Sequence, residues 1–100
     1  MLRINRHREA GKLTLQLEGD LTGAWVEDFL TAWRECRASD ACTVEIDLSC
    51  VGRIDKSGEY LLALVHSHGG RLTGSGLATQ HLIRSIARDW VRTNRELKEA

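Results

Sequence analysis

Apolar and polar residues alternate in three stretches of the chain, over residues 2–4, 13–17 and 44–48. A period of two places successive side chains on opposite faces, so alternation of this kind predicts β-strands with one buried face. The turn residues at 9–12 separate the first two stretches, which predicts a hairpin. The third stretch predicts a further strand, and residues 71–76 predict a short strand or strand remnant.

Three other segments repeat apolar residues at helical spacing. The apolar stripes are Val26, Phe29, Leu30 and Trp33 in the first segment, Leu61, Leu62, Leu64 and Val65 in the second, and Leu82, Ile83, Ile86, Trp90 and Leu97 in the third. We expect residues 19–23 to break the second strand, Thr22 to cap the first helix, and that helix to end near 37–40. Gly69 and Gly70 should stop the second helix, and the third should run almost to the C-terminus.

Strands that alternate with helices predict an α/β fold, and 100 residues fit one domain, residues 1–100. The alternation within the strands further predicts that helices cover one face of the sheet while the other face stays wetter. The chain carries 14 basic and 14 acidic residues. Its net charge therefore provides no overall electrostatic attraction to nucleic acid or to an acidic membrane. Without a long apolar run or an apolar N-terminal signal, we expect a soluble, cytoplasmic protein with no membrane insertion.

Cysteine and histidine do not form a metal-binding pattern. The three cysteines, Cys36, Cys42 and Cys50, are an odd number without a repeated CxxC spacing, which favours reduced, partly buried thiols. His66 and His68 are two residues apart, so on a helix their side chains project about 160° apart and cannot share one ion. We therefore predict no metal and no cofactor.

The segment IDLSCVGRIDKSGEYLLALV, residues 46–65, places a polar turn between a strand and a helix. Either Asp55 or Ser57 could cap that helix. Lys56, Tyr60 and Ala63 fall on the side of the helix opposite its apolar stripe. This side is a candidate docking patch, because aromatic anchors often carry interface energy, and it is also compatible with an ordinary solvated helix face.

With this segment and LTLQLEGDLTG (residues 13–23), the chain resembles the STAS domain, the fold of bacterial anti-sigma factor antagonists and of sulfate-transporter tails. The resemblance covers roughly residues 2–90. It implies a small mixed β-sheet with helices packed mainly on one face. In these antagonists an anti-sigma factor of kinase fold phosphorylates the residue that follows the loop aspartate, and the added charge breaks the complex.

The chain departs from that family at two places. Lys56 stands at the phosphoacceptor position, after Asp55 and before Ser57 and Gly58, and it has no hydroxyl group. The usual switch is therefore expected to be absent, with a fixed positive charge in its place and Ser57 as an alternative acceptor. We also expect an abbreviated C-terminus, because the further strand and closing helix usual in the family have no counterpart after residue 90, so either the sheet is one strand smaller or a partner completes it.

The resemblance implies a non-enzymatic interaction module that docks an anti-sigma factor or related kinase-fold protein through Asp55, Lys56, Ser57, Gly58, Tyr60 and Ala63. One alternative is a structural STAS subunit of a transporter or signalling assembly. Another is a small-ligand or nucleotide sensor, although no glycine-rich phosphate cradle supports it. Asp20 and Asp55 could act as a carboxylate pair, but no nucleophile, base and orienting residue form a catalytic set, so no enzyme is expected. Trp90 and Leu97 suggest a homodimer, or a tail helix that folds back on the open sheet.

Overall fold

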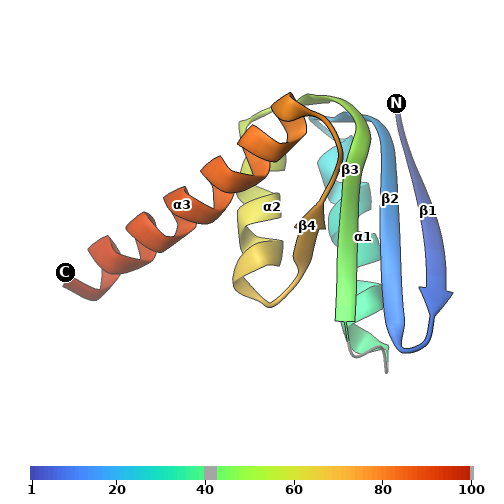
Figure 1. Ribbon diagram of the computed structural model, residues 1–100, viewed down its shortest axis with the longest axis horizontal. Helices are drawn as coiled ribbons and strands as arrows, with labels where there is room; N and C mark the ends of the chain where they lie inside the picture. Colours follow the sequence, from blue (N-terminus) through green and yellow to red (C-terminus); the bar gives the residue numbers. More distant parts are fainter. Residues whose placement is uncertain (40–42, 100) are drawn as a thin grey trace.

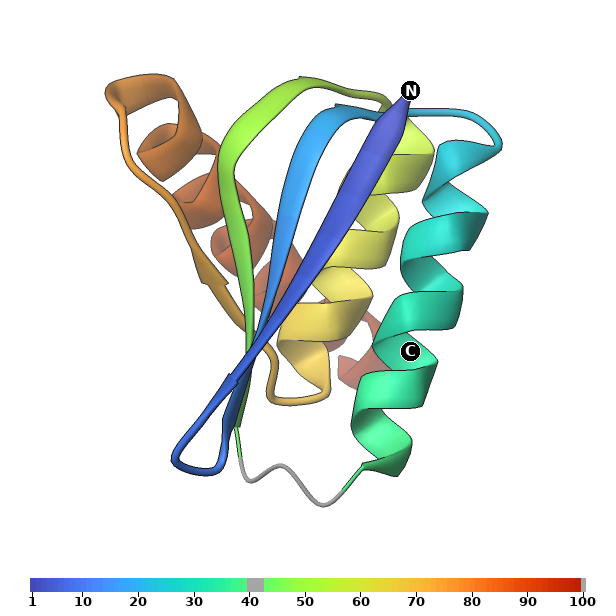
Figure 2. The same ribbon diagram turned by 90° about the vertical axis from the view of Figure 1, so that its right-hand side faces the viewer.

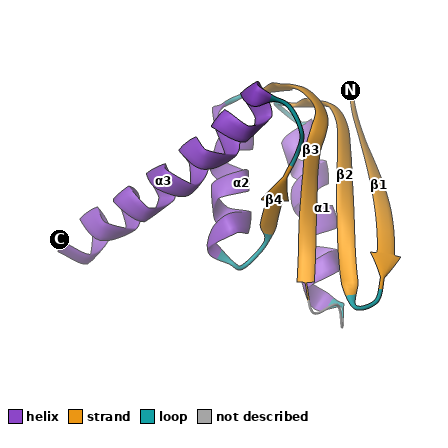
Figure 3. Cartoon of the chain, in the orientation of Figure 1, coloured by secondary structure: helices purple, strands orange, loops and turns teal. Residues whose placement is uncertain are grey.

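The computed structural model describes the backbone of residues 1–39 and 43–99 and the side chains of residues 1–39 and 43–88. In chain order its elements are β1 (Leu2–Glu9), β2 (Lys12–Leu21), α1 (Trp25–Ala38), β3 (Thr43–Ile54), α2 (Lys56–Ser67), β4 (Arg71–Thr73) and α3 (Leu77–Glu99). Figure 1 shows their arrangement and Figure 3 distinguishes helices from strands. The predicted α/β class and the predicted order of elements are confirmed.

Within the described residues the strands form one sheet in the order β1-β2-β3-β4. β1 pairs with β2 in antiparallel fashion, whereas β2 with β3 and β3 with β4 are parallel, so the sheet is mixed. Each parallel step is bridged by a helix, α1 after β2 and α2 after β3, and these helices lie on the same face of the sheet (Figure 2). The expected mixed sheet with helices mainly on one face is therefore confirmed.

The core lies between that face and the helices. Its largest fully buried side chains are Leu15, Leu17, Leu21, Phe29, Ile46, Leu48, Leu62 and Val65. The alternate residues of the central strands, among them Thr14, Gln16 and Asp47, lie on the opposite face and stay partly exposed. The prediction of one buried face and one wetter face is correct.

The strands are longer than the sequence pattern predicted. We expected residues 19–23 to end the second strand, but β2 continues to Leu21, which is completely buried. The strand continues through Gly19 with a local irregularity. The φ angle of Gly19 is 106°, and the register between β2 and β3 shifts between Gly19 and Asp20. β3 likewise continues past Leu48 to Ile54, without strict alternation of burial.

The first helix begins differently from the prediction. Thr22 is not its N-cap; Ala24 occupies that position, and no side chain caps the helix. The carbonyl of Thr22 instead accepts a hydrogen bond from the amide of Trp25 in a turn that precedes the helix. Trp25, the first residue of the helix, is 39 % exposed, whereas Cys36 is only 2 % exposed because it faces the core.

The ends of the other two helices follow the predictions. α2 stops at Ser67, and Gly69, with φ of 89°, donates from its amide to the carbonyl of His66. α3 runs as one helix to Glu99, and its C-terminal part projects away from the sheet instead of folding back over it (Figure 1). The side chains of Trp90 and Leu97, on which the homodimer expectation rests, lie outside the described residues. No helix in the described part of the chain combines the length and apolar character needed to span a membrane.

Candidate functional site

The predicted polar turn lies where β3 ends and α2 begins, and the side chain of Asp55 organises it. Asp55 is the N-cap of α2, and its Oδ1 accepts hydrogen bonds from the amide of Gly58 at 2.8 Å and from the hydroxyl of Ser57 at 2.7 Å. Its Oδ2 accepts from the amide of Gly23 at 2.9 Å, in the turn between β2 and α1. The backbone amide of Asp55 donates to the carbonyl of Leu21 at 3.3 Å. One carboxylate therefore fixes the turn and joins it to the preceding crossover.

These contacts also determine the charge state of Asp55. The Gly23 amide, followed by the Gly58 amide and the Ser57 hydroxyl, stabilises the carboxylate and lowers the pKa of Asp55 below its ordinary value. Asp55 is therefore ionised at neutral pH and fully engaged within the protein. Of the two residues that the sequence offered as a cap, Asp55 is the one that caps the helix.

Gly58 is buried under the turn, against β2. A Cβ atom added at Gly58 would lie 2.5 Å from the carbonyl oxygen of Leu21 and 3.0 Å from a methyl carbon of Ile54. The absence of a side chain thus allows the first turn of α2 to approach the sheet closely. Gly58 supports the site from below, whereas its neighbours form the exposed surface.

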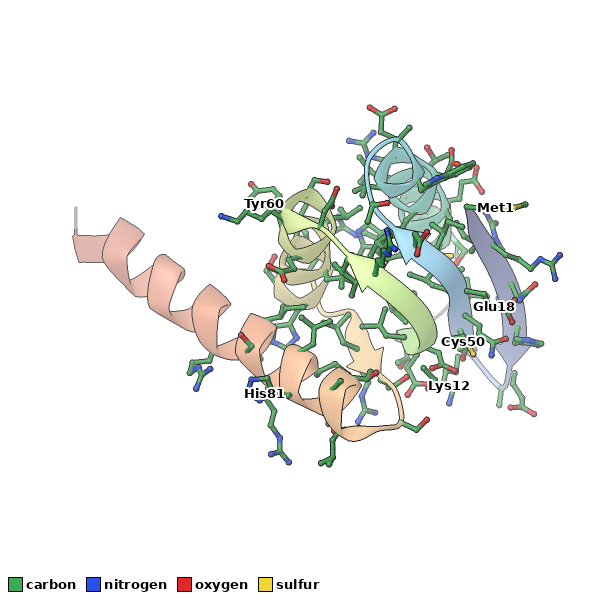
Figure 4. All side chains as sticks on the ribbon, turned by 90° about the horizontal axis from the view of Figure 1, so that it is seen from above. Met1, Lys12, Glu18, Cys50, Tyr60 and His81 are labelled. Atoms are coloured by element: carbon green, nitrogen blue, oxygen red, sulfur yellow. The ribbon has the colours of Figure 1, made fainter. Side chains whose placement is uncertain are left out.

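The other predicted site residues lie in this first turn and the next, and Ala63 alone among them is not exposed. Lys56 and Ser57 are exposed, and Tyr60 is 72 % exposed, the highest value for any described aromatic side chain. Ala63 is half-buried and partly packed against the core. Figure 4 places Tyr60 on the side of α2 that faces away from β1 and β2. The surface formed by Lys56 and Tyr60 is hereafter called the α2 patch.

Ser57 has a defined role within the turn. Its hydroxyl group is the donor to the Asp55 carboxylate, and a phosphoryl group at that oxygen would bring two anions together. The observed geometry therefore engages Ser57 in holding the turn. Lys56, by contrast, is the residue of this turn whose charged side chain is exposed.

A shallow hollow of about 240 Å³ lies beside the turn, between the end of β3 and the first turns of α2 and α3. Its lining residues are Leu48, Val51, Gly52, Ile54, Glu59, Ala78, Thr79 and Leu82. Sequence reasoning missed this hollow, because its lining comes from three elements whose approach depends on how α3 packs.

The remaining candidate residues do not gather into a site. The carboxylate of Asp20 lies 3.8 Å from the N-terminal amine, whereas that of Asp55 is held by amides. His66 is half-buried and His68 is exposed. Within residues 1–39 and 43–88, no three His, Cys, Asp or Glu side chains converge as a metal site would require.

No protein-family model and no curated protein matches the sequence. Solved structures do match the fold. A structure described as "Crystal Structure Analysis of Mglu" aligns with 73 % of this chain at 27 % identity and a TM-score of 0.58. A second, "Crystal Structure Analysis of Mglu in its native form", aligns with 70 % of it at 22 % identity and a TM-score of 0.52. The chain covers only 19 % and 22 % of these two proteins, about a fifth of their length.

Proposed function

We propose that this chain is a non-enzymatic interaction module of the STAS type, acting in the bacterial cytoplasm in the regulation of transcription. It docks a partner, an anti-sigma factor or related protein of kinase fold, through the Asp55–Gly58 turn and the α2 patch. The observation that carries the proposal is the contrast within the turn. Asp55 and Gly58 hold the shape of the turn, while Lys56 and Tyr60 are exposed and their side chains make no hydrogen bond or ion pair in the part of the chain that the structure describes.

A rigid turn with an exposed cation and an exposed aromatic residue has the properties of a preformed binding surface. Little ordering entropy is lost on docking when the backbone is already fixed, and aromatic side chains are enriched among residues that dominate interface energy. The lysine gives the surface a positive charge and offers no hydroxyl group that could be phosphorylated. The module therefore binds constitutively, or its partner supplies the switch.

The test is a quantitative pull-down from bacterial extract with the wild-type protein, Lys56→Glu and Tyr60→Ala as baits. We expect a kinase-fold protein to be retained by the wild type and lost with both variants. Arg34→Glu is the matched control, because Arg34 is exposed on α1 and the same change in charge occurs there away from the turn. Equal recovery of the same proteins with all four baits would indicate that the interface does not include the α2 patch.

A structural role within a larger assembly is the second candidate. It is favoured by the comparison with Mglu, in which a fold of this kind makes up about a fifth of a longer chain. In that case the domain would bind its neighbour in a fixed stoichiometry that nucleotide does not change. Analytical ultracentrifugation of the captured complex with and without ATP separates this role from that of a regulated antagonist.

A further inference from the structure

The hollow between β3, α2 and α3 has the size of one side chain. Its volume of about 240 Å³ is below the roughly 300–1,000 Å³ of pockets that enclose whole small molecules. The hollow is open to solvent. It lies beside the α2 patch, because Glu59, one of its lining residues, is in the first turn of the same helix as Lys56 and Tyr60. A protruding side chain of a docked protein fits such a place better than a free metabolite does.

The chemistry of the lining restricts which side chain fits. Val51, Ile54 and Leu82 provide apolar contact, and Glu59 is the one charged residue in the lining. Among the described residues, no ion pair or hydrogen bond engages the Glu59 carboxylate. A carboxylate at the rim of an apolar hollow complements a side chain with an apolar stem and a cationic head.

We propose that this hollow receives an arginine side chain of the partner protein, with its aliphatic stem over Val51, Ile54 and Leu82 and its guanidinium on Glu59. Arginine fits better than lysine because its guanidinium is less strongly hydrated and can bind a carboxylate through two parallel hydrogen bonds. Arginine is also enriched at interface cores. The assignment of the arginine to the partner rests on the proposed function, whereas the selectivity of the hollow does not.

The experiment uses small probes, so it does not require the partner. N-acetyl-arginine amide, the lysine analogue and the citrulline analogue are titrated separately into ¹⁵N-labelled full-length protein, up to about 50 mM, the range in which millimolar affinities are measurable. Citrulline has the shape of arginine without its charge. We expect amide shifts at the lining residues that are at least about fivefold weaker with citrulline than with arginine, and intermediate with lysine.

Two variants check the location. Glu59→Gln should reduce arginine binding to the level of citrulline, and Ala78→Trp should abolish all shifts by filling the hollow. His81→Trp is the control, because His81 is exposed on the same helix (Figure 4) and does not line the hollow. The far-ultraviolet circular dichroism of each variant establishes that it is folded.

Equal binding of citrulline and arginine, no effect of Glu59→Gln, or an absence of shifts at the lining residues would overturn the proposal. These outcomes are independent of the Lys56→Glu pull-down. If the probes bind as expected but Lys56→Glu retains every captured protein, the hollow is a genuine arginine site and the proposed docking surface is wrong. If the pull-down succeeds and the probes fail, the docking surface excludes the hollow.

Discussion

The carboxylate of Asp55 accepts a hydrogen bond at 2.9 Å from the backbone amide of Gly23, a residue 32 positions earlier in the chain. The other carboxylate oxygen holds the amide of Gly58 and the hydroxyl of Ser57. The start of α2 and the turn before α1 are thus tied together by one side chain. The exposed Lys56 follows directly, so the shape of the proposed docking surface depends on the contacts that Asp55 makes.

The Asp55 interactions predict a pH dependence of stability. Because the folded state lowers the pKa of Asp55, its contribution to stability is fully present above the unfolded value of about 3.9 and is lost as the pH falls through the lower folded value. Asp55→Asn should therefore lower the thermal midpoint at pH 7 and flatten its dependence on pH below about 4. Ser57→Ala, which leaves both amide contacts in place, should have a smaller effect. Thermal unfolding between pH 2 and 7 measures both, and an unchanged acid limb in Asp55→Asn would contradict the assignment.

Gly58→Ala should destabilise the protein by about 1–3 kcal/mol, because the added methyl group would overlap the carbonyl oxygen of Leu21 and the side chain of Ile54. Gly52→Ala is the matched control. A Cβ atom at Gly52 would have no neighbour closer than 3.8 Å, so its effect should stay within about 0.5 kcal/mol. Urea denaturation measures the two free energies, and equal effects would show that the turn does not approach β2 as closely as described.

Lys56→Glu should separate binding from stability. Lys56 is the first residue of α2, where a negative charge interacts favourably with the helix dipole, so the variant should be as stable as the wild type or more stable by up to about 0.5 kcal/mol. Loss of partner binding by this variant would then reflect the surface and not unfolding. A clear fall in its urea midpoint would mean instead that Lys56 makes a structural contact.

The cysteines should differ in reactivity in a Cys42→Ser background. Cys50 is exposed, whereas Cys36 is buried and burial raises the pKa of its thiol. Both effects slow labelling, because the thiolate is the reactive form and reagent reaches Cys36 only when the structure opens. Titration with a disulfide reagent should show one fast thiol and one slower by roughly a hundredfold or more. In urea the two thiols should be labelled at the same rate. Equal labelling rates in native buffer would contradict the burial of Cys36.

The sequence predicted those parts of the fold that depend on local periodicity. Alternation of Leu13, Leu15 and Leu17 located a strand with one buried face, and paired glycines located the end of α2. It failed at Gly19, because a glycine with positive φ can end a strand or bend one, and the pairing with β3 decides between these outcomes. Contacts between residues that are distant in the sequence could not be predicted either. Neither the hydrogen bond from the Gly23 amide to Asp55 nor the hollow beside α3 has a local sequence pattern.

The attachment of α3 can be tested with two apolar residues of that helix. Ile86 is 5 % exposed and, within residues 77–88 of α3, is the one that belongs to the buried core, whereas Leu77 is 92 % exposed. Ile86→Ala should cost about 2–4 kcal/mol, because the lost transfer free energy is accompanied by a cavity between α3 and the core. Leu77→Ala should change stability by less than about 0.5 kcal/mol. If urea denaturation gives these values, Ile86 anchors α3 over the hollow. Similar small costs at both positions would mean that α3 is not anchored by Ile86, and the wall that it contributes to the hollow would then be in doubt.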